Sequence, residues 1–160
     1  PSGLGLGQNS DPGPRVLHPL TLAAEAFVAI DALTNSNGYR WSLSGPRGLV
    51  TSDRSFQSTD ATAGTSLYRL AAGTYTLSVA GRGDVVGEYR LRVLDLSDAA
   101  PVTIGAETSG TLRPSRETDV YRFEATAGDS LFFDAISSAG GSTTWRLLDP
   151  FGRTVFGPDS

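Results

Sequence analysis

The chain contains no cysteine, no methionine and no lysine, and these absences remove several classes of chemistry. Without cysteine, the chain can form no disulfide, no thiolate metal site and no cysteine nucleophile. Secretion stays open, because a domain of this size can bury a core without disulfide staples. Without lysine, the chain has no Schiff-base lysine and no lysine for an isopeptide cross-link.

Clustered positive charge and long apolar runs are also absent from the sequence. The 13 basic residues, all arginine, are scattered among 17 acidic ones, and the net charge of −4 argues against a nucleic-acid-binding surface. No apolar run approaches the roughly 20 residues that a membrane-spanning helix needs, so we expect no membrane insertion. No window carries apolar residues at helical spacing over three turns, and we expect no helix.

What the sequence does contain is one stretch that occurs twice. VAIDALTNSNGYRWSLSGPRG occupies residues 28–48, and LFFDAISSAGGSTTWRLLDPFG occupies residues 131–152. The Asp-Ala pair recurs after 103 residues, and the Trp, Pro and Gly marks recur after 104. The matching positions are Asp31, Trp41, Pro46 and Gly48 in the first stretch and Asp134, Trp145, Pro150 and Gly152 in the second. We interpret this pattern as a tandem repeat of about 104 residues.

Short stretches of alternating polar and apolar residues, separated by Gly-rich turns, predict an all-β fold. The clearest are GTYTLSV at 73–79 and GEYRLRV at 87–93, which we expect to form a hairpin through the turn at 81–84. Their Tyr, Leu and Val residues are predicted to face the core, and their Thr and Arg residues the solvent. Further strands are predicted at 16–22, 27–33, 39–43, 66–70, 120–125 and 131–135. Many short strands at this spacing favour an antiparallel β-sandwich.

The repeat predicts two domains of unequal completeness. Residues 1–103 form the first copy, in which 1–15 are a linker or a loosely held first strand, because they contain little to bury. Residues 104–160 form the N-terminal half of a second copy, without a counterpart of the strands at 57–103. We expect this half to be completed either by a continuing chain or by strands of a neighbouring subunit, because it leaves open sheet edges.

Several segments resemble a known family. DVYRF at 119–123, AGD at 127–129 and LLDPFG at 147–152 look like the first half of a bacterial pre-peptidase C-terminal domain. AAGTYTLSV at 71–79 and GEYRLRV at 87–93 look like its second half. The resemblance implies a jelly-roll-like β-sandwich carried by secreted proteins, either beside the catalytic domain of exported proteases or in tandem within large surface proteins. The first copy departs from the pattern at 16–19, where VLHP stands at the place of DVY.

Acidic loop residues are the candidates for metal binding. Asp53, Asp60, Asp84 and Asp149 are weak candidates for a calcium site, since Ca²⁺ takes about six to eight oxygen ligands. No calcium-loop motif accompanies them, so solvated turn carboxylates are the favoured interpretation and no cofactor is assigned.

The paired aspartates Asp31 and Asp134 differ from these loop residues, because each falls at a strand end. We predict that each carboxylate accepts backbone N–H bonds in the following turn, in a structural role.

No residue pattern predicts catalysis. His18 is the only histidine, and nothing in the sequence places a second histidine or a poised acid beside it. No G-x-S-x-G elbow is present. The tripeptide Arg-Gly-Asp at 82–84 has the sequence of a recognition motif, but these residues are equally typical of a turn. Each tryptophan lies two residues before a leucine on one strand face, which indicates core packing rather than a sugar-binding platform.

These features favour a non-catalytic structural or adhesive repeat module of a large extracellular or cell-surface protein. Its expected partners are neighbouring repeats or identical subunits, assembled end to end into a filament. Two alternatives stay open. One is an accessory domain of a secreted protease or hydrolase, involved in targeting or maturation. The other is a carbohydrate-binding module, which would need an exposed aromatic row that the alternation does not show.

Overall fold

The structure is a computed structural model, and it describes residues 7–9, 15–60 and 67–159. Its elements are β1 (Gly7–Asn9), β2 (Val16–Leu22), β3 (Ala26–Ala32), β4 (Tyr39–Gly45), β5 (Gly48–Ser55), β6 (Leu67–Leu70), β7 (Gly73–Gly81), β8 (Gly87–Tyr89), β9 (Leu91–Asp95), the 3-10 turn η1 (Leu96–Asp98), β10 (Ala100–Pro101), β11 (Tyr121–Arg122), β12 (Trp145–Leu148) and β13 (Thr154–Asp159). These ranges contain no α-helix, and none of their elements is a helix able to cross a membrane. The prediction of an all-β fold with antiparallel sheets is confirmed.

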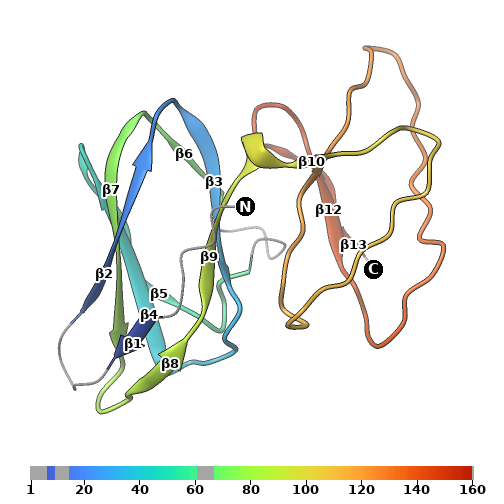
Figure 1. Ribbon diagram of the computed structural model, residues 1–160. Helices are drawn as coiled ribbons and strands as arrows, with labels where there is room; N and C mark the ends of the chain where they lie inside the picture. The colour runs from blue at the N-terminus through green and yellow to red at the C-terminus, as the bar shows by residue number, and fades with distance from the viewer. Residues whose placement is uncertain (1–6, 10–14, 61–66, 160) are drawn as a thin grey trace.

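The strands β1 to β9 form the first unit, in which two larger sheets share one core and β1 pairs with β8 in a separate two-stranded sheet. One sheet has the order β2-β7-β4-β5 and the other β6-β3-β9, with antiparallel pairing throughout. The two sheets lie face to face in Figure 1. Their alternating apolar side chains point between them, and the fully buried ones include Val28, Ile30, Trp41, Leu43, Phe56, Leu77, Val79 and Tyr89. This burial is the main stabilising contribution to the first unit.

The strands β7 and β9 show the predicted alternation, but the predicted hairpin between them is wrong. Strand β7 pairs with β2 and β4, whereas β9 pairs with β3 in the other sheet. The chain therefore crosses from one sheet to the other between β7 and β9, through β8, which pairs with β1. Tyr75, Leu77 and Val79 of β7 and Leu91 and Val93 of β9 point toward the same core from opposite sides. The same alternation of polar and apolar residues is expected for two strands in opposite sheets and for two neighbouring strands of one sheet. It shows only which face of each strand is buried.

The second unit, residues 104–159, contains much less regular structure than predicted. The strand expected at 120–125 is reduced to β11, which pairs in parallel with β10, and the strand expected at 131–135 does not form. Only the hairpin of β12 and β13 is antiparallel, and it matches that of β4 and β5 in carrying a tryptophan at its start. Within the described ranges no strand flanks 131–135, so its backbone groups lack the ladder partners that would hold a strand.

A polar contact lies inside the core of the first unit. The indole Nε1 of Trp41 donates to Thr59 Oγ1 at 2.7 Å, and Thr59 Oγ1 donates to the backbone oxygen of Ser55 at 2.6 Å. Trp41 and Thr59 are both buried. The contact satisfies the one polar group of a large apolar side chain, as buried tryptophans require.

We predict that Thr59→Val destabilises the chain by about 1–3 kcal/mol, because it leaves the indole N–H of Trp41 buried without an acceptor. Urea unfolding followed by circular dichroism measures this change. Thr21→Val, at an exposed position of β2, is the matched control and should change the free energy of unfolding by less than about 0.5 kcal/mol. Equal effects of the two substitutions would contradict the assignment.

Candidate functional site

The outer face of the three-stranded sheet contacts the second unit, and ion pairs and hydrogen bonds make this contact the candidate functional site. At its centre lies Asp31, in β3, whose side chain is 0% exposed. Its Oδ2 accepts hydrogen bonds from Arg92 Nη2 at 2.9 Å and from the backbone N–H of Thr118 at 3.1 Å. Asp31 therefore joins a strand of the first unit to a turn of the second.

Arg92, in β9, connects the two units in the same place. Its Nη1 donates to Glu117 Oε1 at 2.6 Å, and its Nη2 also donates to the backbone oxygen of Thr118 at 2.7 Å. Glu117 in turn accepts the backbone N–H of Arg113 at 2.6 Å. One guanidinium thus binds two carboxylates, one from each unit, and this multidentate geometry suits arginine better than any other cation.

Burial dominates the electrostatics of Asp31. Desolvation raises the pKa of its carboxyl above the ordinary value, against the lowering effect of the Arg92 and Thr118 hydrogen bonds. A buried ion pair of this kind adds little net stability compared with an apolar replacement, but the loss of one partner is costly. The pair therefore acts chiefly to specify how the second unit sits.

Two further contacts support the same interface. Arg116 lies over the end of β3, where its Nη2 donates to the backbone oxygen of Gln57 at 3.0 Å, and it also contacts Ala32 and Asn35 at 3.4 Å. The turn between β12 and β13 lies against β3 and β6. A Cβ atom added at Gly152 would come within 2.8 Å of Phe27 and Leu67, and φ is +76° there, so this turn requires glycine.

The structure gives the eight repeat marks different environments. Trp41 is buried, while Trp145 is half-buried in a ring cluster with Phe133 and Phe156. Gly48 and Gly152 both have positive φ in their hairpin turns. Pro46 approaches Gly73, and Pro150 is exposed.

The prediction for the paired aspartates is wrong for Asp31 in one respect. Its carboxylate does accept a backbone N–H, but from Thr118 in the second unit rather than from the following turn. Asp134 is exposed, in a segment without a strand.

The four calcium candidates lie on separate elements. Asp53 is in β5, Asp60 follows β5, Asp84 is in the exposed turn after β7, and Asp149 begins the turn after β12. Among the described residues, no group of three or more His, Cys, Asp or Glu side chains is placed to hold a metal ion.

Asp149 has a clear structural role instead of a metal ligand's. Its Oδ1 accepts the backbone N–H of Phe151 and of Arg153 at 2.9 Å, and its Oδ2 accepts Arg153 Nε at 2.6 Å. Although desolvation opposes them, these bonds hold the pKa of the carboxyl below its ordinary value.

His18 lies on β2, and its ring contacts Tyr89 of the core. Its Nε2 is 2.8 Å from the hydroxyl oxygen of Tyr89, and the two rings meet edge to face with centroids 6.0 Å apart. Desolvation lowers the pKa of His18, and desolvation together with Tyr39 raises the pKa of Tyr89 to about 12. A neutral imidazole packed on a neutral phenol is a structural contact at neutral pH.

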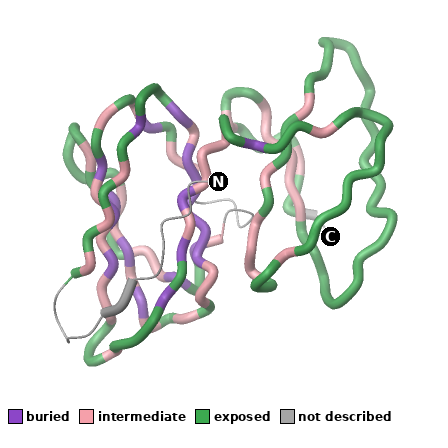
Figure 2. The backbone as a smooth tube through the Cα atoms, viewed as in Figure 1, coloured by how far each residue is buried: buried purple, intermediate pink, exposed green. Residues whose placement is uncertain are grey.

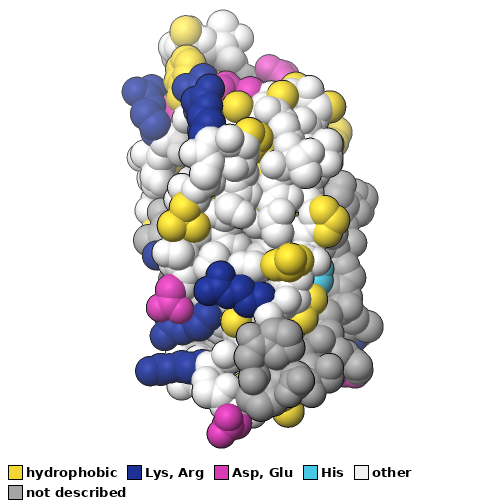
Figure 3. All heavy atoms as spheres, turned by 90° about the vertical axis from the view of Figure 1, so that its left-hand side faces the viewer, with side chains coloured by type: hydrophobic (Ala, Val, Ile, Leu, Met, Phe, Trp, Pro, Cys, Tyr) yellow, Lys and Arg dark blue, Asp and Glu magenta, His cyan; other side chains and the backbone are white. Residues whose placement is uncertain are grey.

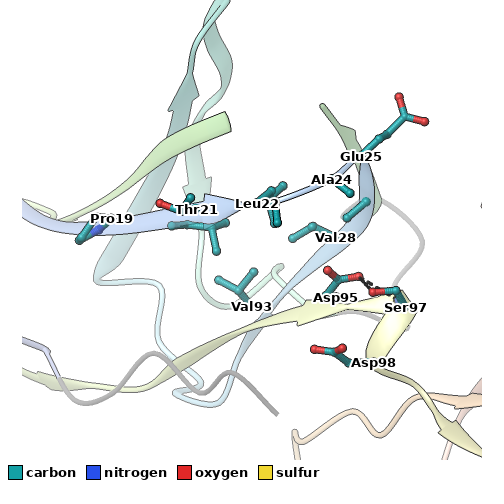
Figure 4. A pocket seen from close by; sticks show the side chains of 13 residues that line it. Pro19, Thr21, Leu22, Ala24, Glu25, Val28, Val93, Asp95, Ser97 and Asp98 are labelled. Atoms are coloured by element: carbon teal, nitrogen blue, oxygen red, sulfur yellow. Dashed lines mark hydrogen bonds between the residues drawn. The ribbon is translucent and has the colours of Figure 1, made fainter. Parts of the chain in front are cut away.

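A hollow of about 450 Å³ opens between β2, β3 and β9, as Figure 4 shows. Leu22, Val28 and Val93 line its apolar part. Of the carboxylates at its rim, Asp95 accepts the backbone N–H and the hydroxyl of Ser97, and Glu25 pairs with Arg69. These two acids are held by local partners and are not poised as a catalytic pair.

On the described part of the outer surface beside β2 and β7, no single type of side chain predominates. Figure 3 shows acidic, basic and hydrophobic side chains interspersed there, with side chains of other kinds and backbone between them. The Arg-Gly-Asp tripeptide at 82–84 is exposed in the turn after β7. The large aromatic residues of the described first unit mostly lie inside it: Tyr39, Trp41, Phe56, Tyr75 and Tyr89 are buried.

Apart from Asp31 and Gly152, which are repeat marks, the residues that form the interface are those that sequence reasoning missed. Arg92 was expected to point to solvent with the other polar residues of its strand, and the structure places it against Asp31 with only 19% of its side chain exposed. Glu117 and Thr118 carried no local signal at all. The single available clue was the repeated Asp31, since an aspartate in an apolar strand needs a partner.

We predict that Arg92→Met destabilises the chain by about 3 kcal/mol or more, because it leaves the Asp31 carboxylate buried without its cation. Adding Asp31→Asn should restore part of the loss. Arg69→Met, which breaks the exposed pair with Glu25, is the control and should cost less than about 1 kcal/mol. Urea unfolding of the parent chain and the three variants measures these values, and equal losses for Arg92→Met and Arg69→Met would refute the role assigned to Arg92.

We also predict a loss of stability on mild acidification through His18. Its pKa is lower in the folded chain than in the unfolded one, so the unfolded state binds more protons and stability falls as the pH drops below about 6.5. His18→Gln removes this titration. The melting temperature should fall less between pH 7.5 and pH 5.5 in the variant than in the parent chain, and parallel decreases would contradict the prediction.

Comparison of the chain with protein-family models, with curated proteins and with solved structures finds no match in any of the three. The proposal for its function therefore stands on the geometry of the chain and on the sequence resemblance.

Proposed function

We propose that the chain is a non-catalytic structural module, in which an ion-pair joint fixes one unit on the next. The single observation that carries this proposal is the buried Asp31 carboxylate, shared by Arg92 of the first unit and the Thr118 turn of the second. Specification of a unique arrangement is the best-attested use of a buried charged group.

The finer architecture belongs to this proposal. The first unit is a jelly-roll-like β-sandwich and residues 104–160 are the N-terminal half of a second copy, in a tandem repeat of about 104 residues, as the paired sequences at 28–48 and 131–152 indicate. Two face-to-face sheets in the first unit and a matching Trp-headed hairpin in both units support this account.

The setting is an extracellular or cell-surface protein, in which neighbouring repeats or identical subunits are the partners. The resemblance to tandem pre-peptidase C-terminal domains supports this setting. A fixed joint is also what a spacer needs, because an array of units keeps its reach only if the angle between neighbours does not vary. The interface supplies this through Arg92, Arg116 and the Gly152 turn, which contact the first and second units at separate points.

We predict that the joint is rigid and that its rigidity depends on Arg92. The chain has no cysteine, so Leu49→Cys in β5 and Thr154→Cys in β13, both exposed, provide two unique spin-label sites. Pulsed electron paramagnetic resonance should give one narrow distance distribution for the labelled parent chain. Arg92→Met should broaden it, and Arg69→Met should not. A broad distribution in the labelled parent chain would show that the units are not fixed and would overturn the proposed function.

A further inference from the structure

Residues 131–135 form a segment outside any strand, and its large apolar side chains, those of Leu131, Phe132 and Phe133, are exposed. Its sequence, LFFDA, matches VAIDA at 28–32 in the Asp-Ala pair and in the apolar positions before it. Val28 and Ile30 are 0% exposed in β3, whereas Leu131 and Phe133, at the matching positions, are 36% and 37% exposed. Figure 2 shows the contrast between the buried β3 and the exposed chain around 131–144. The two segments share the same pattern of apolar residues, and they differ in which strands lie beside them.

β3 lies between two strands, β6 and β9, and among the described strands 131–135 lacks a counterpart of either; β9 is the one that pairs along the whole of 28–32. In the antiparallel register of β3 and β9, Ile30 lies opposite Val93, Asp31 opposite Arg92 and Ala32 opposite Leu91. An Asp-Arg pair thus stands between two apolar pairs. Opposite charges and apolar residues that face each other across strands both stabilise such pairing.

Two features of the second unit, an exposed carboxylate and an aromatic cluster, are suited to binding a strand of this kind. Asp134 is exposed, and no basic group of the described residues lies within ion-pair distance of it. Phe133 stands in a ring cluster, with centroids 5.7 Å from Phe123, 5.3 Å from Trp145 and 5.7 Å from Phe156. An assembled aromatic cluster with one open side is typical of an interaction surface.

We propose that residues 131–135 bind an antiparallel β-strand of the Leu-Arg-Val type found in β9, with its arginine opposite Asp134. This inference rests on the proposed function, in which both units share one architecture. The charge of Asp134 favours this occupant over a purely apolar strand. It also disfavours a folded second copy, because Arg92 of such a copy is already bound to its own Asp31 and Glu117. Binding is by strand addition to an open segment.

The test is titration of the intact chain with a synthetic peptide of the sequence of residues 88–98, EYRLRVLDLSD. Nuclear magnetic resonance should show saturable shifts in the amides of 131–136. Asp134→Arg should weaken binding about fivefold or more, because a favourable cross-strand pair becomes a repulsive one. A peptide carrying Arg92→Asp should bind the Asp134→Arg chain better than the parent chain. Glu107→Arg, at an exposed position outside the segment, is the matched control and should leave the affinity unchanged.

Three outcomes would overturn the inference: no shift at 131–136, equal weakening by Asp134→Arg and Glu107→Arg, or failure of the reversed peptide to rescue the reversed chain. Concentration-dependent self-association that the peptide does not displace would also overturn it, in favour of a second copy as the occupant. The spin-label distance between the two units does not depend on the peptide. Failure of strand binding with a narrow distance distribution therefore refutes this inference alone, and a broad distribution refutes the proposed function.

Discussion

The burial of the Asp31 carboxylate is the constraint on which the arrangement of the two units depends. A carboxylate removed from water must be compensated, and here the compensation comes from both sides of a boundary. Arg92 approaches from the neighbouring strand of the same sheet, and the Thr118 N–H approaches from the following unit. The second unit supplies part of the compensation for this charge, because its Thr118 N–H donates to Asp31 and its Glu117 carboxylate accepts from Arg92. The need to compensate a buried charge within one sheet therefore also fixes the position of the second unit on the first.

The two units differ in how far their own residues complete them. In the first, two sheets enclose a core of aliphatic and aromatic side chains. In the second, four aromatic rings gather on one side, while Phe132 is 89% exposed and the chain around it lacks strand partners among the described residues. The two units contact each other through the hydrogen bonds and ion pairs of Asp31, Arg92 and Arg116 and through the Gly152 turn, which lies against Phe27 and Leu67. These contacts suit a joint that fixes the orientation of one unit on the next.

The sequence was sufficient to predict most strands of the first unit and the side of each that is buried, but it did not predict β5, and the strand predicted at 87–93 divides into β8 and β9. Alternation in β7 and β9 reports burial directly, since a strand exposes one face to each side. Alternation does not report which strand lies beside which, and the predicted hairpin between β7 and β9 failed for that reason. The strand expected at 131–135 failed for a different reason, because a strand exists only with a partner.

The interface residues were beyond sequence reasoning for a physical cause. Asp31 and Thr118 are 87 residues apart, and the hydrogen bond between them leaves no periodic trace in the chain. Arg92 has the spacing of a solvent-facing residue and lies on the outer face of its sheet, where Asp31 lies opposite it and Glu117 and Thr118 of the second unit cover it. Repetition drew attention to the aspartate, but the nature of its partners became visible only in three dimensions.

The central claim is that the buried carboxylate of Asp31 holds the second unit through the Thr118 amide. Hydrogen exchange at that single amide measures the contact directly. The account predicts that Thr118 exchanges far more slowly than the exposed Ser115 nearby, and that Asp31→Ala removes this protection. Exchange at Thr118 as fast as at Ser115 in the parent chain would contradict the account.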